Sequence, residues 1–278
     1  MSALIAVAHG SRDPRSSATI HRAVDALRRR RPDLDVRVAF LDLSEPGVDQ
    51  VVDDLAGAGH ERIVAVPMLL GKAFHAKVDL PELLHAARTR HPHVSITQAD
   101  VLGDDRLLIE AVRDRIVDTG VAVSDSTVGI ALAAVGSSVA PANQRTRVIA
   151  QKLLAGTGWA GAVTCFATSV SPSPTDAIAQ LRTLGADRIV VAPWFLAPGL
   201  LTDRIEASVA GLPNVAHAEV IGAHPALADL VSRRYDSAIS MGRSAGSTPV
   251  ARAVATPEPN ALPHRFSEPV HQQSHRHR

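Results

Sequence analysis

Short apolar runs alternate with longer amphipathic stretches along the first 240 residues of the chain. In the first half the apolar runs occupy residues 3–8, 36–41, 62–67 and 94–101. The stretches between them carry apolar residues at helical spacing, and Pro14 and Pro32 mark the start and the end of the first helix. Nearly continuous apolar strands are typical of a parallel sheet that is covered on both faces. The pattern therefore predicts a four-stranded parallel sheet flanked by helices.

The second half of the chain repeats this order. Its apolar runs begin near Val128, Ala162, Arg188 and Val215. Matching residues are separated by 126 positions, as in the pairs Gly10 and Gly136, Phe40 and Phe166, and Pro67 and Pro193. Because crossovers between parallel strands are right-handed, each half should form a small doubly wound unit. We expect an α/β protein with two tandem flavodoxin-like domains, residues 1–122 and 127–240.

The composition changes near Gly242 to Pro, Ser, Ala and His with little periodicity. Such a segment buries too little apolar surface to fold, so we expect residues 243–278 to be a disordered tail. Its histidines are His264, His271, His275 and His277. They are able to collect metal, although a solvated tail is the simpler interpretation.

Charge and composition exclude several classes of function. The net charge is +1 and aromatic residues make up 3% of the chain, so neither a basic face nor stacking platforms for nucleic acid are expected. The single Cys165 excludes an intrachain disulfide framework or a multi-cysteine metal site. No apolar run approaches the ~18 residues that span a membrane, and the first is too short for a signal peptide. We therefore expect a cytoplasmic protein that binds neither nucleic acids nor membranes.

The duplication separates residues that the fold requires from residues that serve chemistry. Three polar residues of the first half have no polar metal-ligating counterpart in the second: His9 is replaced by Val135, Asp42 by Thr168 and His75 by Leu201. Each of the three follows the carboxyl end of a predicted strand, which is where open α/β sheets form their binding crevice. A single loop histidine is more often structural, but the joint loss of all three favours a functional site. Two imidazoles and a carboxylate suit a divalent first-row metal and leave coordination positions open.

The sequence around these residues resembles the CbiX/SirB family of class II tetrapyrrole chelatases. The blocks that carry the resemblance are His9-Gly10-Ser11-Arg12-Asp13-Pro14, residues 38–46 (VAFLDLSEP) and residues 66–81 (VPMLLGKAFHAKVDLP). The likeness extends over both halves, about residues 1–238, as in the long two-domain members. One departure is Asp42, where the family usually has Glu. The resemblance implies a chelatase-like fold and a lyase that inserts iron or cobalt into sirohydrochlorin, for sirohaem or cobalamin biosynthesis.

The family's chemistry also implies roles for individual residues. A histidine with a pKa near ~6.5 can accept a pyrrole proton and hold a metal loosely, so His9 is expected to act as base and ligand. His75 would be the second ligand, and Asp42 would add charge or orient the site. No cofactor beyond the substrate metal is expected. The second half should form the other wall of one cleft, so that a monomer acts as an internal pseudo-dimer.

The acidic rim of the macrocycle requires cationic partners. Arg12, Lys72 and Lys77 flank the two histidines and are candidates, although an ordinary exposed charge is the simpler interpretation of each. Gly10 and Ser11 would let the macrocycle approach the backbone closely.

Two questions stay open from the sequence. Histidine and carboxylate ligands accept both iron and cobalt, and only the family context favours iron and sirohaem. The alternative function is a non-catalytic carrier of divalent metal, with the histidine-rich tail as its loading arm. A carrier accounts for the tail but not for the cationic residues around the site or for the duplicated fold, so we favour the enzyme.

Overall fold

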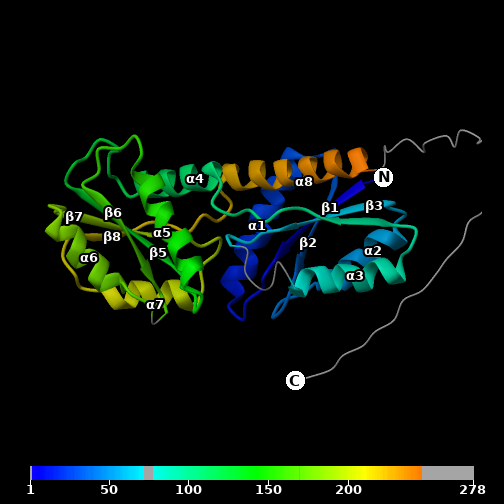
Figure 1. Cartoon of the computed structure of the whole chain (residues 1–278), viewed down its shortest axis with the longest axis horizontal. Coiled ribbons are helices and arrows are strands. Elements are labelled where there is room, and N and C mark those ends of the chain that lie inside the picture. The colour runs from blue at the N-terminus through cyan, green and yellow to red at the C-terminus, as the bar shows by residue number, and fades with distance from the viewer. Residues whose placement is uncertain (1, 72–77, 169, 246–278) are drawn as a thin grey trace, which may run out of the picture.

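The computed structural model describes residues 2–71, 78–168 and 170–245 of the chain (Figure 1). The first half contributes the strands β1 (Ser2–Ala8), β2 (Asp35–Phe40), β3 (Arg62–Pro67) and β4 (Ser95–Gln98). The second contributes β5 (Val128–Ala134), β6 (Gly161–Phe166), β7 (Arg188–Pro193) and β8 (Val215–His217). They form two parallel sheets with the orders β2-β1-β3-β4 and β6-β5-β7-β8. The predicted fold class is confirmed.

The strand register preserves the repeat seen in the sequence. Ala3 lies opposite Ile63 in the first sheet, and Gly129 lies opposite Ile189 in the second, which is the same pair 126 positions later. The fourth strand is shorter than the predicted run of residues 94–101. It ends at Gln98, although the Ala99 N–H still donates to the Ala65 carbonyl at 2.9 Å. Beyond it, the Val101 carbonyl accepts a hydrogen bond from the guanidinium of Arg234.

Eight helices connect and cover the strands in the described part of the chain. They are α1 (Pro14–Arg30), α2 (Val48–Gly57), α3 (Leu80–Arg90), α4 (Arg106–Val117), α5 (Ala140–Leu154), α6 (Pro174–Thr183), α7 (Leu200–Val209) and α8 (Pro225–Ala245). Asp13 caps α1 by accepting a hydrogen bond of 2.9 Å from the backbone N–H of Arg15. None of the helices in these described segments is both long and apolar enough to cross a membrane.

The last helix of each half covers the sheet of the other half. Helix α4 packs on α5 and β7 of the second sheet, whereas α8 packs on α1, β3 and β4 of the first (Figure 1). The two exchanged helices also contact each other. Since equivalent helices make reciprocal contacts, the halves are related like the subunits of a two-fold dimer. A boundary between residues 122 and 127 therefore separates the two sheets. It does not separate each sheet from the helix of the other half that covers it, so a division into contiguous domains remains a proposal.

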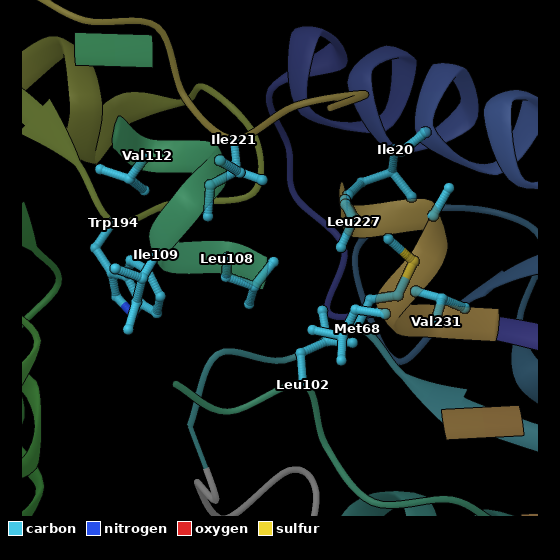
Figure 2. Packing of buried hydrophobic residues seen from close by; sticks show 14 of the residues in the cluster. Ile20, Met68, Leu102, Leu108, Ile109, Val112, Trp194, Ile221, Leu227 and Val231 are labelled. Carbon is cyan, nitrogen blue, oxygen red and sulfur yellow. The ribbon is translucent and has the colours of Figure 1, made fainter. Parts of the chain in front are cut away.

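The exchange joins the two halves into one apolar core. Leu108, Ile109 and Val112 of α4 lie on the side of Trp194, while Val231 of α8 lies beside Met68, and all six are buried in a single cluster (Figure 2). Burial of one such side chain stabilises the fold by about 1.5–3 kcal/mol relative to exposure. Removing either exchanged helix would therefore expose the sheet of the opposite half.

Helix α8 is also anchored at its middle. The Tyr235 hydroxyl donates a hydrogen bond of 3.0 Å to Ser2 Oγ, and the Arg31 guanidinium lies 5.3 Å from the centre of the Tyr235 ring. The helix continues to Ala245, slightly beyond residue 243, where the sequence predicted the tail to begin. The predicted tail from residue 246 onward, with its four histidines, lies outside the described residues.

Candidate active site

The loops that follow β1 and β2 run side by side at the carboxyl edge of the first sheet. The backbone N–H of Leu41 donates to the carbonyl of Ala8 at 2.9 Å, and that of Asp42 donates to the carbonyl of His9 at 3.0 Å. The parallel ladder thus continues past the strands for two further residues. It brings His9 and Asp42, two of the three candidates from the sequence, onto neighbouring loops, where both side chains are exposed.

Gly10 allows these loops to approach each other. Its φ is +96°, and a Cβ at this position would lie 1.6 Å from the carbonyl oxygen of Asp42. Only glycine fits both the backbone conformation and the space. Ser11 then fixes the loop: its N–H donates to Ser44 Oγ, and the Ser44 hydroxyl donates to the Ser11 carbonyl, both at 3.1 Å.

The carboxylate of Asp42 is oriented by the next residue. Its Oδ1 accepts a hydrogen bond of 2.8 Å from the backbone N–H of Leu43. Leu43 adopts this geometry with φ 60°, in the left-handed region that favours glycine and asparagine. Sequence reasoning missed Leu43 and Ser44. Both lie in the 38–46 block that carries the family resemblance, but a positive φ at a leucine leaves no signal in the sequence.

An ion pair shows that the carboxyl edges of the two sheets face each other. Arg15, in the first turn of α1, has its Nη2 2.5 Å from Asp13 and 2.6 Å from Asp203 in the first turn of α7. The hydrogen bonds from Arg15 lower the pKa of Asp13, so this carboxyl stays ionised in neutral solution. Arg12 of the same loop is exposed. The carboxyl ends of β1–β3 and of β5–β7, with the loops that follow them, form the facing edges of the two sheets.

The second half keeps the architecture of the loops without their ionisable side chains. The backbone N–H of Thr168 donates to the carbonyl of Val135 at 3.2 Å, and Gly136 has φ +87°. Asn143 replaces the serine clasp, because its Oδ1 accepts from the Ser137 N–H at 2.8 Å and its Nδ2 donates to the Ser137 carbonyl at 2.7 Å. The fold therefore forms this loop with a valine and a threonine in place of His9 and Asp42.

The remaining candidates from the sequence lie outside the described residues. These are His75, the expected second ligand, and Lys72 and Lys77, the expected partners of acidic groups. Within the segments that the structure describes, no group of three or more His, Cys, Asp or Glu side chains is placed to hold a metal. The described candidate metal ligands at this edge are thus His9 and Asp42. A site with three ligands stays a prediction.

Comparisons with known proteins agree on one family. The family model CbiX matches residues 3–119 and 129–238. The chain is 28% identical over 247 residues to the sirohydrochlorin ferrochelatase of Priestia megaterium, covering 86% of this chain and 91% of that protein. It is 26% identical over 254 residues to the sirohydrochlorin cobaltochelatase of the same organism, covering 86% of this chain and 80% of that protein.

A solved structure shares the two-sheet fold. The structure of SirB from Bacillus subtilis with Fe³⁺ superposes with a TM-score of 0.75 at 27% identity, covering 87% of this chain and 97% of that chain. The match covers both halves of this chain, including the second half, in which Val135 and Thr168 replace the ionisable loop residues.

Proposed function

Because the chain belongs to the CbiX family, we propose that it is a sirohydrochlorin chelatase, which inserts a divalent iron or cobalt ion into sirohydrochlorin. Relatives similar over most of the chain carry the names of both the ferrochelatase and the cobaltochelatase. The metal and the macrocycle are both substrates of this reaction. The observation that carries the proposal is the pairing of His9 with Asp42 on adjacent loops of the edge that faces the second half.

Metal insertion requires that two pyrrole N–H protons leave the macrocycle while a partly dehydrated ion enters it. A neutral imidazole accepts such a proton near neutral pH, and His9 is exposed at the edge where the substrate would arrive. The Asp42 carboxylate on the next loop favours the incoming cation. Imidazole and carboxylate ligands bind Fe²⁺ and Co²⁺ alike. Two exposed donors hold an ion loosely enough to release it.

The other substrate contacts follow from the resemblance to the family. His75 would complete the metal site, and Lys72 and Lys77 would bind the carboxylates of the macrocycle. Arg12, exposed on the same loop as His9, would serve the same purpose on the other side. Gly10 and Ser11 would let the ring approach the backbone. The second half would cover the ring, so that one chain binds one macrocycle and needs no second copy.

The test is an anaerobic insertion assay with purified protein, sirohydrochlorin and Fe²⁺ or Co²⁺ in parallel. We expect the absorbance spectrum of the macrocycle to change to that of the metal complex over many turnovers per chain, faster than without protein. A metal carrier would bind the ion but leave the rate of insertion at its uncatalysed value. That outcome with both metals would overturn the proposal.

A further inference from the structure

Exposed apolar side chains gather at the facing edges. Among the described residues, nine large hydrophobic side chains are exposed, and four of them lie in loops or first turns at these edges. The four are Leu43 (48% exposed), Val135 (44%), Val139 (56%) and Leu200 (75%). Single exposed hydrophobic residues are ordinary, but several that converge on one place mark a binding surface.

Leu43 occupies a position that is unfavourable for a leucine. Its left-handed backbone costs about 1 kcal/mol for a residue with a Cβ, and its side chain is half exposed. The hydrogen bond from its N–H to Asp42 explains the backbone conformation. It does not explain the side chain, because glycine or asparagine would form the same bond with less strain. The backbone conformation therefore does not account for a leucine at this position.

Val139 is also unfavourable where it lies. It occupies the N-cap position of α5 and makes no capping hydrogen bond, whereas the equivalent residue of the first half, Asp13, caps α1. An apolar N-cap costs about 1 kcal/mol relative to Ser or Asp. The chain thus exposes a valine at the facing edge in place of a residue that would stabilise the helix.

Val135 and Leu200 belong to the same edge of the second sheet. Val135 follows β5 as His9 follows β1, so it holds the position related to His9 by the internal two-fold arrangement. Leu200 begins α7, one turn before Asp203, whose carboxylate reaches Arg15 beside the His9 loop. Both residues therefore lie on the part of the second half that is turned toward His9 and Asp42.

We propose that Leu43, Val135, Val139 and Leu200 form an apolar clamp that holds the two faces of the planar tetrapyrrole and sets its height above His9. Leu43 would contact the face on the metal side, and the other three residues the opposite face. A flat ring with apolar faces and an acidic rim matches apolar side chains on both edges with the exposed Arg12 beside them. A protein docked here would cover His9 and Asp42. The clamp rests on the proposed function and assigns positioning residues for it.

The test combines variants that remove apolar surface without destabilising the fold. Leu43→Asn tolerates the left-handed backbone, Val139→Ser restores a helix cap, and Leu200→Gln suits the first turn of a helix. The matched control is Leu184→Gln, because Leu184 is 60% exposed at the end of α6, away from the facing edges. Leu43→Met, which keeps an apolar side chain, should behave like the wild type.

The measurements are the Kd of metal-free sirohydrochlorin, by optical titration, and kcat and KM for insertion, together with the melting temperature. Each single variant loses one partly buried apolar contact and should raise Kd and KM about threefold. The triple variant, which combines Leu43→Asn, Val139→Ser and Leu200→Gln, should raise them about thirtyfold. The melting temperature should be unchanged or higher. Unchanged Kd and KM in the triple variant, alongside normal insertion by the wild type, would overturn the clamp and leave the proposed function intact. Failure of the wild type to bind or metallate the macrocycle would overturn both.

Discussion

The backbone N–H of Asp42 donates a hydrogen bond of 3.0 Å to the carbonyl oxygen of His9. This bond extends the ladder between β1 and β2 beyond the last strand residues, so the rigid sheet itself sets the spacing of the imidazole and the carboxylate. Functional groups supported by regular structure are held more precisely than those on free loops. The geometry of the pair therefore depends on backbone contacts that mutation can test separately from the side chains.

Gly10→Ala should disrupt this arrangement far more than an ordinary glycine substitution. Its Cβ would overlap the Asp42 carbonyl at 1.6 Å, in addition to the strain of a φ of +96°. The matched control is Gly59→Ala, which has φ +84° but nothing within 4 Å of the added Cβ. We expect the control to lose about 1 kcal/mol of unfolding free energy and Gly10→Ala to lose at least about 3 kcal/mol. Equal losses in denaturant titrations would show that the contact with Asp42 is unimportant.

Asp42→Asn should separate the charge of this residue from its structural role. The asparagine Oδ1 can still accept the hydrogen bond from Leu43, so the melting temperature should stay within about 2 °C of the wild type. Insertion should slow at least about tenfold, because the negative charge that favours the incoming cation is gone. Asp42→Glu, with the residue that the family usually carries, should retain activity. Full activity of Asp42→Asn would assign Asp42 a purely structural role.

Local sequence patterns predict much of this molecule. The apolar runs and their spacing predict both sheets, because strand burial and helix periodicity are read within windows of about ten residues. The repeat also isolates His9 and Asp42, since the duplicated half keeps the fold without them. These two residues meet because each follows a strand that ends at the same edge of the sheet.

The exchange of helices could not be predicted in this way. The apolar face of α4 shows that something covers it, but the same face fits either sheet, and only the assembled chain selects the second. The contact between Arg15 and Asp203 joins residues 188 positions apart, so no local pattern reveals it. Likewise, Arg234 of α8 donates a hydrogen bond to the Val101 carbonyl of the first half, 133 positions away.

The helix exchange predicts that residues 1–126 alone do not form a stable monomer. Without α8, the buried residues of β3 and α1 that it covers would meet water, and the apolar face of α4 would have no sheet to cover. We expect insoluble protein or a dimer in which α4 of each copy covers the other. Coexpression with residues 127–245 should restore a soluble one-to-one complex. Size-exclusion chromatography with light scattering distinguishes these outcomes, and a folded monomer of 1–126 would contradict the prediction.

Cys165 should be chemically inert in the folded protein. It is 0% exposed in β6, and burial raises the pKa of its thiol to about 12. At pH 8 only roughly 1 in 10,000 of the folded molecules would carry a thiolate. Thiol reagents should therefore label Cys165 only in denaturant, and the folded state should lose stability as the pH rises above the ordinary thiol value of 9.0. Rapid labelling of the native protein would show that β6 opens readily.

The most direct test of the account is the initial rate of anaerobic metal insertion by His9→Val at saturating sirohydrochlorin and Fe²⁺ or Co²⁺. Valine is the residue that the second half carries at the equivalent position, and His9 is exposed, so the melting temperature should match that of the wild type. Loss of the proton acceptor should slow insertion at least about 100-fold with both metals. A folded His9→Val protein that inserts either metal at a rate close to the wild type would contradict the assignment of the site to the first half.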